Sequence, residues 1–197
     1  VFVGKLNHSK GYDIYKDTII RILNEYPDWR ALSLGDESRR SIYIKHKQHK
    51  EYGFLNHQKT LDILDKSEIA VVPSRWEEPF GRVSLEATAS GCATVTSNRG
   101  GLLETSNYIV SIDNINSEKL YMNIKDLINN KIKRKKIQNL SRNNVIHLID
   151  KNKKKIDLIR SNIFSKFQLN FIKNRLKIIN LFNQGQKSNY RLFNISI

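Results

Sequence analysis

The sequence predicts an α/β protein, with a doubly wound parallel sheet over residues 1–130 and a basic helical extension over residues 131–197. Two observations carry this prediction. In the first part, short apolar runs alternate with helical patterns, which is typical of a parallel sheet with helices on both faces. In the second part, 19 Lys and Arg stand against 5 Asp and Glu over residues 111–197, while residues 1–110 are nearly balanced at 15 against 14.

The first third of the chain contains three predicted strands and two predicted helices. Val1–Val3 is an apolar run that ends at a glycine, and the apolar residues of Ile19–Tyr26 recur at i, i+3, i+4 and i+7, as on the buried face of a helix. Ala31–Leu34 and Tyr52–Leu55 are the second and third predicted strands. Leu61–Leu64 is placed in a short helix that an upstream asparagine caps.

The middle of the chain holds the clearest strand, Ile69–Val72, which is closed by a proline. A helix over residues 81–90 follows, and Gly91 provides its left-handed C-cap. Ala93–Thr96 supplies the next strand, and the near-continuous apolar character of both strands fits burial on two faces. From about Ser117 to Asn183 the pattern is helical and rich in lysine.

Length and composition bound the class of protein. A chain of 197 residues suffices for one principal domain, and because it opens on Val1 inside an apolar run, we expect an N-terminal part to precede it. The sequence shows neither the ~20 apolar residues of a membrane-spanning helix nor a signal peptide, so we expect a soluble, cytoplasmic protein. A single cysteine, Cys92, agrees with a reducing compartment, and its small apolar neighbours predict a packed core thiol.

The basic second part invites a search for an anionic partner. It holds +14 (19 minus 5) of the total charge of +15. Such a patch attracts nucleic acid or anionic lipid. The alternative is that compositional bias has placed lysines on solvated helix faces. Aromatic residues interleaved for base stacking are lacking, which argues against nucleic acid.

Two loops that follow predicted strands contain groups able to bind an anion, at the edge where parallel α/β sheets bind ligands. The first runs from Gly4 to Gly11, where the two glycines permit close turns and Lys5 and Lys10 bring two positive charges. Solvated lysines are the alternative for this loop.

The second loop, Pro73–Arg82, leads into a helix whose first free N–H groups are expected at Phe80–Val83. Free N–H groups and the positive end of the helix dipole favour a diphosphate. Glu78 and Glu86 flank that position, and ionised carboxylates there are suited to accept hydrogen bonds from the hydroxyl groups of a sugar and a ribose.

These residues resemble the C-terminal domain of group 1 glycosyltransferases, also called glycosyltransferase family four, whose GT-B fold pairs two facing Rossmann-like domains. The resemblance runs from Val1 to about Glu104, and its most specific element is the spacing from Glu78 to Glu86. The supporting elements are Gly4-Lys5-Leu6 with Lys10-Gly11, Gly35-Asp36, and Gly100-Gly101-Leu102-Leu103-Glu104.

The resemblance implies a retaining transferase that moves a sugar from a nucleotide-diphosphate sugar to an acceptor in glycan or glycolipid synthesis. It implies that Lys5 and Lys10 bind the donor diphosphate, that Glu78 contacts the transferred sugar and that Glu86 holds the ribose hydroxyls. The remaining donor-binding residues that it implies are Gly4, Gly53, Phe54, Phe80, Gly81, Arg82 and Val83. For each of these residues the structural alternative is packing or a helix cap. An acceptor domain is expected in the missing N-terminal half, so this fragment should be inactive alone.

No cofactor is expected. Lysines and a helix N-terminus stabilise a leaving diphosphate without a metal, and His46 and His49 are expected on a solvated helix surface rather than in a metal site. Two features depart from the family pattern: Lys5 stands where arginine is usual, and residues 105–110 lack the glycine of the usual loop.

Three other functions stay open: a noncatalytic nucleotide-sugar-binding module or partner subunit, a nucleic-acid-binding protein, and a GT-B epimerase, against which the glutamate pair argues. The extension is expected to serve attachment. Apolar residues such as Ile156, Leu158, Phe164 and Phe167 are expected either to cover the core or to lie against an anionic membrane, which would make the protein peripheral on its inner face.

Overall fold

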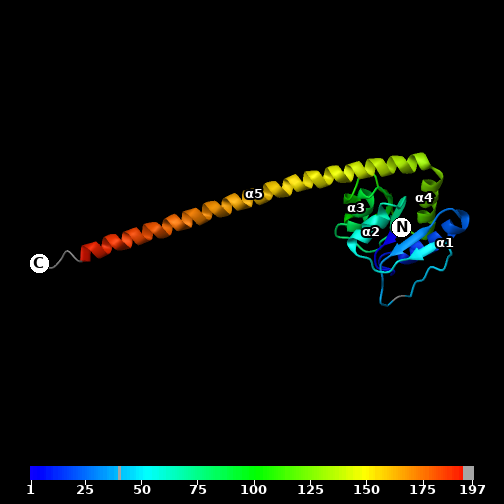
Figure 1. Ribbon diagram of the computed structural model, residues 1–197, viewed down its shortest axis with the longest axis horizontal. Helices are drawn as coiled ribbons and strands as arrows, with labels where there is room; N and C mark the ends of the chain where they lie inside the picture. Colours follow the sequence, from blue (N-terminus) through cyan, green and yellow to red (C-terminus); the bar gives the residue numbers. More distant parts are fainter. Residues whose placement is uncertain (40, 193–197) are drawn as a thin grey trace. The chain divides into compact units, whose positions relative to one another are not determined.

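A computed structural model describes residues 1–39 and 41–192, with side chains as far as Phe167 and at 172–174, 176 and 177 (Figure 1). The strands are β1 (Phe2–Val3), β2 (Ala31–Leu34), β3 (His49–Glu51), β4 (Ile69–Val72), β5 (Ala93–Ser97) and β6 (Val110–Ile112). The helices are α1 (Tyr12–Glu25), α2 (His57–Leu64), α3 (Arg82–Ala89), the 3-10 helix η1 (Gly100–Glu104), α4 (Ser117–Asn129) and α5 (Lys131–Leu192).

The six strands form one sheet in the order β3-β2-β1-β4-β5-β6, and every pairing between neighbours is parallel. The chain builds one half outward from β1 to β3, and then returns to the centre to build the other half from β4 to β6. The predicted doubly wound parallel sheet is confirmed. Strand order reverses between β1 and β4, which is where such sheets form their ligand crevice.

Helices cover both faces of this sheet. α1 packs against α4 on one face, while α2 and α3 pack together on the other, where α3 contacts β4 and β5 (Figure 1). On the first face the buried rings of Phe2, Tyr12 and Tyr15 pack with centroids 5.0 to 6.0 Å apart. On the second face Cys92 is fully buried with Leu64, as expected of a packed core thiol, and burial raises the pKa of the thiol to about 11.

Most predicted element positions are confirmed. The Asn56 side chain accepts a hydrogen bond from the Lys59 N–H at 2.9 Å and caps α2, and Gly91 follows α3 with a positive φ of 89°. The third strand was predicted wrongly at Tyr52–Leu55, because it is the polar segment His49–Glu51. An edge strand has only one neighbour and needs little apolar surface, and Gly53 at φ 66° is not extended.

The edge strand β6 was missed by the sequence analysis. It has three residues, of which only Ile112 is buried, so its apolar signal is weak. The other correction concerns His46 and His49, which do not lie on a helix. His49 belongs to β3, where its Nε2 lies 2.8 Å from the Ser33 Oγ, and His46 lies in the loop before it.

The helix α5 begins at Lys131, where the basic extension was predicted to begin, but its first turns belong to the sheet domain. Arg134, Gln138, Ser141 and Val145 recur every three or four residues and are buried. Arg134 Nε donates to the Glu68 Oε2 at 3.1 Å, and Gln138 Nε2 donates to the Glu68 carbonyl at 2.9 Å. The chain divides after Leu148 into this domain and a second unit that begins at Ile149.

Among the described residues, every helix lacks the long apolar stretch that a membrane-spanning helix requires.

Candidate functional site

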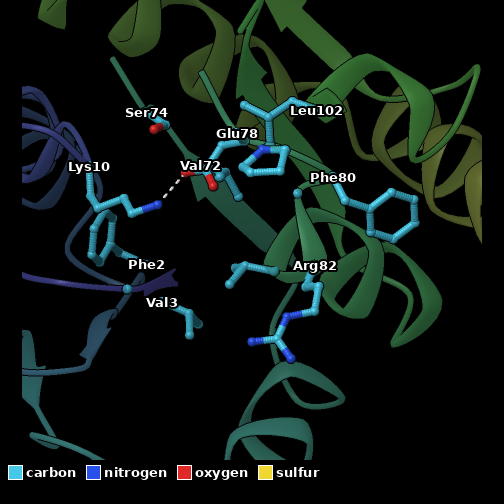
Figure 2. A pocket seen from close by; sticks show the side chains of 13 residues that line it. Phe2, Val3, Lys10, Val72, Ser74, Glu78, Phe80, Arg82 and Leu102 are labelled. Carbon is cyan, nitrogen blue, oxygen red and sulfur yellow. Dashed lines mark hydrogen bonds and ion pairs between the residues drawn. The ribbon is translucent and has the colours of Figure 1, made fainter. Parts of the chain in front are cut away.

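A cavity of about 350 Å³ lies at the carboxyl ends of β1 and β4, where the strand order reverses (Figure 2). Two loops build it: the loop from Gly4 to Gly11 that joins β1 to α1, and the loop from Pro73 to Gly81 that joins β4 to α3. The lining residues are Phe2, Val3, Gly4, Lys10, Val72, Ser74, Glu78, Pro79, Phe80, Gly81, Arg82, Val83 and Leu102.

The two loops touch through backbone, and a glycine makes this approach possible. Gly11 has a φ of 70°, and a Cβ at this position would lie 2.0 Å from the carbonyl oxygen of Pro73. The Arg75 N–H donates to the Ser9 carbonyl at 2.9 Å, next to this contact. The close approach brings the side chain of Lys10 over the end of β4.

Behind the second loop, two consecutive glycines without side chains allow the two backbones to approach closely. A Cβ on Gly100 would lie 2.3 Å from the Glu78 carbonyl oxygen, and one on Gly101 would lie 2.8 Å from the Phe80 Cα. The Gly101 N–H donates to the Glu78 carbonyl at 2.7 Å. The Gly100-Gly101 pair of the sequence motif therefore fixes the backbone that carries Glu78.

The helix α3 begins at Arg82, with Gly81 as its N-cap at φ 79°. The first four N–H groups of a helix have no partner within it, so here they belong to residues 81–84. This corrects the predicted range of Phe80–Val83 by one residue, because the left-handed Gly81 ends the preceding loop. The positive end of the helix dipole faces the cavity that Gly81, Arg82 and Val83 line.

Lys10 and Glu78 meet inside the cavity. The Lys10 Nζ lies 2.5 Å from the Glu78 Oε1, and only 31% and 15% of the two side chains are exposed. Lys10 reaches across from the first loop to the carboxylate of the second (Figure 2). The pair places a cation and a hydrogen-bond acceptor in front of the helix N-terminus.

The structure brings together seven of the predicted site residues in this cavity: Gly4, Lys10, Glu78, Phe80, Gly81, Arg82 and Val83. Four others lie outside its lining: Lys5, Gly53, Phe54 and Glu86. The two loops were expected at one anion-binding edge of the sheet, with Glu78 and Glu86 flanking the anion. Lys10, Glu78 and Gly81 do line one cavity there, whereas Lys5 and Glu86 lie outside its lining.

Three of these residues, Lys5, Glu86 and Phe54, have the following surroundings. Lys5 is exposed and lies near Glu37, whose pKa is lowered by the hydrogen bond from Asn7 and by the charge of Lys5. Glu86 lies one helical turn beyond Arg82, three-quarters buried, with its Oε1 3.9 Å from the His57 Nδ1. Phe54 is 77% exposed.

Sequence reasoning missed Ser74, which is 1% exposed and holds the second loop in shape. Its Oγ accepts a hydrogen bond from the Trp76 N–H at 3.2 Å, and its carbonyl accepts one from the Ser97 Oγ at 2.6 Å. Its position directly after the proline that closes β4 was the only signal in the sequence.

A second missed feature is the ion pair of Arg75 and Asp13. Both terminal nitrogens of Arg75 donate to the Asp13 carboxylate, at 2.6 and 2.7 Å, and thereby tie the second loop to the first turn of α1. Burial raises the pKa of Asp13, but the hydrogen bonds and charge of Arg75 outweigh it, so the pKa is lowered overall.

We therefore expect Asp13→Asn to lower the free energy of unfolding by about 1 kcal/mol at neutral pH, since the pair is partly exposed. A carboxyl whose pKa is lowered by folding contributes stability above its unfolded pKa of about 4, and this contribution is lost as the pH falls through the folded value. Urea unfolding from pH 7 to pH 3 checks this. A stability difference that stayed constant across the range would contradict it.

Among residues 1–39 and 41–192, no three His, Cys, Asp or Glu side chains are grouped so that they could hold a metal ion. The cationic side chains in the lining of the cavity are Lys10 and Arg82. The metal-free site stays a prediction.

Comparison with known proteins identifies one family and several relatives of greater length. The family described as "Glycosyl transferases group 1" matches residues 1–144. Spore coat protein SA of Bacillus subtilis is 31% identical over 159 residues, which are 72% of this chain and 42% of that protein. A glycogen synthase of Mycobacterium tuberculosis is 34% identical over 111 residues, 53% of this chain and 27% of the enzyme. The chain thus spans less than half the length of these relatives.

Solved structures resemble the fold. The C-terminal domain of a glycosyl transferase group 1 family protein (LpcC) from Francisella tularensis superposes with a TM-score of 0.67 at 23% identity, over 74% of this chain and 83% of that domain. Anabaena Alr3699/HepE in complex with UDP-glucose gives a TM-score of 0.66 at 21% identity, over 81% of this chain and 48% of the other. At these identities the likeness concerns the fold alone.

Proposed function

The chain belongs to the group 1 glycosyltransferases, and we propose that it is the donor-binding half of a retaining enzyme that transfers a sugar from a nucleotide-diphosphate sugar to an acceptor in glycan or glycolipid synthesis. The observation that carries this proposal is the Lys10–Glu78 pair in the cavity before the N-terminus of α3. HepE, whose fold resembles that of this chain, has been solved with UDP-glucose, and we propose a donor of the same class, a nucleotide-diphosphate sugar, for this chain.

The diphosphate would lie between Lys10 and the N–H groups of residues 81–84. An ammonium group and free helix N–H groups together favour a doubly charged anion. Gly4 and Gly81 lack side chains, so phosphate oxygens would approach the backbone closely. We therefore propose the centre of the cavity as the position of the leaving group.

The transferred sugar would lie next to Glu78, whose backbone is held by Gly100 and Gly101 and whose carboxylate can accept hydrogen bonds from hydroxyl groups. Glu86 would hold the ribose one helical turn deeper along α3, and Gly53 and Phe54 would lie beside the base. Lys5 would add a second positive charge at the rim. These four roles follow from the family resemblance.

Catalysis would consist mainly of stabilising the departing nucleoside diphosphate. As the bond between sugar and phosphate breaks, negative charge grows on the diphosphate, and Lys10, released from Glu78, and the α3 N-terminus would stabilise that charge. Retention would follow from attack on the face that the leaving group departs from, without a protein nucleophile or a metal. The acceptor would be bound by an N-terminal half, so the 197-residue chain should bind donor without turning it over.

Glu78 competes with the diphosphate for Lys10, since the two side chains are paired at 2.5 Å. We expect Glu78→Gln to raise the affinity for a free nucleoside diphosphate by about three- to tenfold. In the variant the diphosphate no longer has to displace the charged hydrogen bond between Lys10 and the Glu78 carboxylate. The preference for the sugar nucleotide over the nucleoside diphosphate should fall, because the sugar loses its acceptor.

Calorimetric titration with UDP, GDP and ADP and their glucose or mannose derivatives measures both quantities. An equal loss of affinity for the nucleoside diphosphate and its sugar derivative would contradict the assignment of Glu78 to the sugar. Turnover after fusion to an N-terminal half would distinguish an enzyme from a noncatalytic donor-binding subunit.

We further propose a cytoplasmic location. The single cysteine, Cys92, is a buried free thiol, which agrees with a reducing compartment. A peripheral position on the inner face of a membrane is the corresponding expectation for the extension.

A further inference from the structure

The unit that begins at Ile149 carries an apolar face with no partner among its described side chains. At 3.6 residues per turn, six residues fall within one arc of about 140°: Ile149, Ile156, Ile159, Ile163, Phe164 and Phe167. All six are exposed, from 45% at Ile149 to 72% at Phe167. Large exposed apolar faces mark contact surfaces.

The rest of this helix surface is strongly basic. Lys151, Lys154, Lys155 and Lys166 lie outside the apolar arc and are exposed. Residues 149–197 contain 11 Lys and Arg against 2 Asp, a net charge of +9. Any partner must therefore accept an apolar helix face while it attracts positive charge.

A second copy of this chain fits poorly. In a heptad that places Ile149, Ile156 and Ile163 at position a, Asn152 and Lys166 fall at position d, where a coiled coil requires apolar side chains. Lys155 and Arg160 would then face each other as like charges across a parallel dimer.

Nucleic acid would answer the charge but would leave the isoleucine and phenylalanine side chains in water. A lipid surface satisfies both requirements, because its acyl region takes the apolar face and its anionic headgroups attract the lysines. Arg160 and Lys153 lie within the apolar arc, between Ile149 and Phe164, and long cationic side chains at such positions extend to the headgroups.

We propose that the helix from Ile149 to at least Phe167 lies in the plane of an anionic membrane surface, with Ile156, Ile159, Ile163 and Phe167 in the acyl boundary and the lysines among the headgroups. This attachment is separate from the donor cavity, whose residues all precede 103. It would hold the transferase domain at a lipid surface without a membrane-spanning segment.

Co-sedimentation of the 197-residue chain with vesicles tests this proposal. We expect binding to phosphatidylcholine vesicles that contain phosphatidylglycerol, no binding to phosphatidylcholine alone, and release as added salt shortens the screening length below about 8 Å. Lys151→Gln, Lys154→Gln and Lys155→Gln together should weaken binding on the order of a hundredfold, at about fivefold per lysine.

The matched control carries the same charge loss in the first unit, at the exposed Lys45, Lys47 and Lys66, and should bind vesicles nearly as well as the unchanged chain. A third variant, Ile159→Ser, Ile163→Ser and Phe167→Ser, keeps every charge and should lose at least about tenfold. Thermal unfolding of the first unit and UDP titration show whether each variant retains a folded domain.

Equal losses in the two lysine variants would overturn the proposal, as would vesicle binding unaffected by the serine changes. Sedimentation equilibrium showing a dimer that the serine variant abolishes would assign the face to a second copy. Duplex DNA binding unaffected by the serine variant, without vesicle binding, would assign the charge to nucleic acid. Failure to bind any nucleotide, with vesicle binding intact, would refute the proposed function and leave this attachment standing.

Discussion

Lys10→Ala is expected to lower the affinity for nucleoside diphosphates and their sugars alike by about 10- to 100-fold, the value of a charged hydrogen bond of about 1.5–3 kcal/mol. Lys10 lines the cavity together with Arg82, the first residue of α3, and its Nζ donates a hydrogen bond to the Glu78 carboxylate. The variant also leaves the Glu78 carboxylate, 15% exposed, without its partner, which adds repulsion toward a diphosphate.

Two further lysine variants give this experiment its controls. Lys66→Ala removes an exposed charge just before β4, at the opposite edge of the sheet, and should leave affinity within about twofold because solvent and salt screen it. Lys5→Ala should have an effect between these two, since Lys5 lies outside the cavity near Glu37. Isothermal calorimetry at one fixed salt concentration compares all three. Equal affinities for Lys10→Ala and Lys66→Ala would remove Lys10 from the site.

Gly11→Ala is expected to destabilise the domain by about 3 kcal/mol or more and to abolish measurable donor binding, because overpacking and a strained φ act together. Its Cβ would lie 2.0 Å from the Pro73 carbonyl oxygen, which belongs to backbone and has no flexible side chain to move aside. The β1–α1 and β4–α3 loops would have to separate, and Lys10 would lose its position opposite Glu78.

Gly53→Ala is the matched control for the backbone. Gly53 has a φ of 66°, close to the 70° of Gly11, but a Cβ there would meet nothing within 4 Å. The control therefore pays only the left-handed strain of about 1–2 kcal/mol. Thermal unfolding distinguishes the two, at roughly 2–4 °C per kcal/mol for a domain of this size. Similar melting temperatures for both variants would contradict the contact between the loops.

The parallel sheet could be predicted because its central strands are buried on both faces. The four residues of β4 are all buried, and the apolar run Ile69–Val72 marks them in the sequence. The edge strands carry no such signal: β3 is His49-Lys50-Glu51, and its pairing with β2 is made by backbone hydrogen bonds that any residue supplies. Edge strands were for that reason misplaced or missed.

The candidate site shows the same division. Glycines and charged residues that follow strands predicted Gly4, Lys10, Glu78 and Gly81, because strand ends converge at one edge of a parallel sheet. The direction in which a loop side chain points is set by tertiary contacts, so the sequence did not reveal that Lys5 lies near Glu37. Nor did it reveal the pairing of Arg75 with Asp13, residues separated by 62 positions.

The most direct test of the donor site is a crystal structure of this chain with the nucleoside diphosphate that calorimetry selects from UDP, GDP and ADP. The account predicts diphosphate density in the cavity at the ends of β1 and β4, with a phosphate oxygen within hydrogen-bond distance of the Lys10 Nζ and the N–H groups of residues 81–84, and with the Lys10–Glu78 pair opened. Diphosphate bound at the opposite edge of the sheet, or bound with Lys10 still paired to Glu78 and no contact to α3, would contradict it.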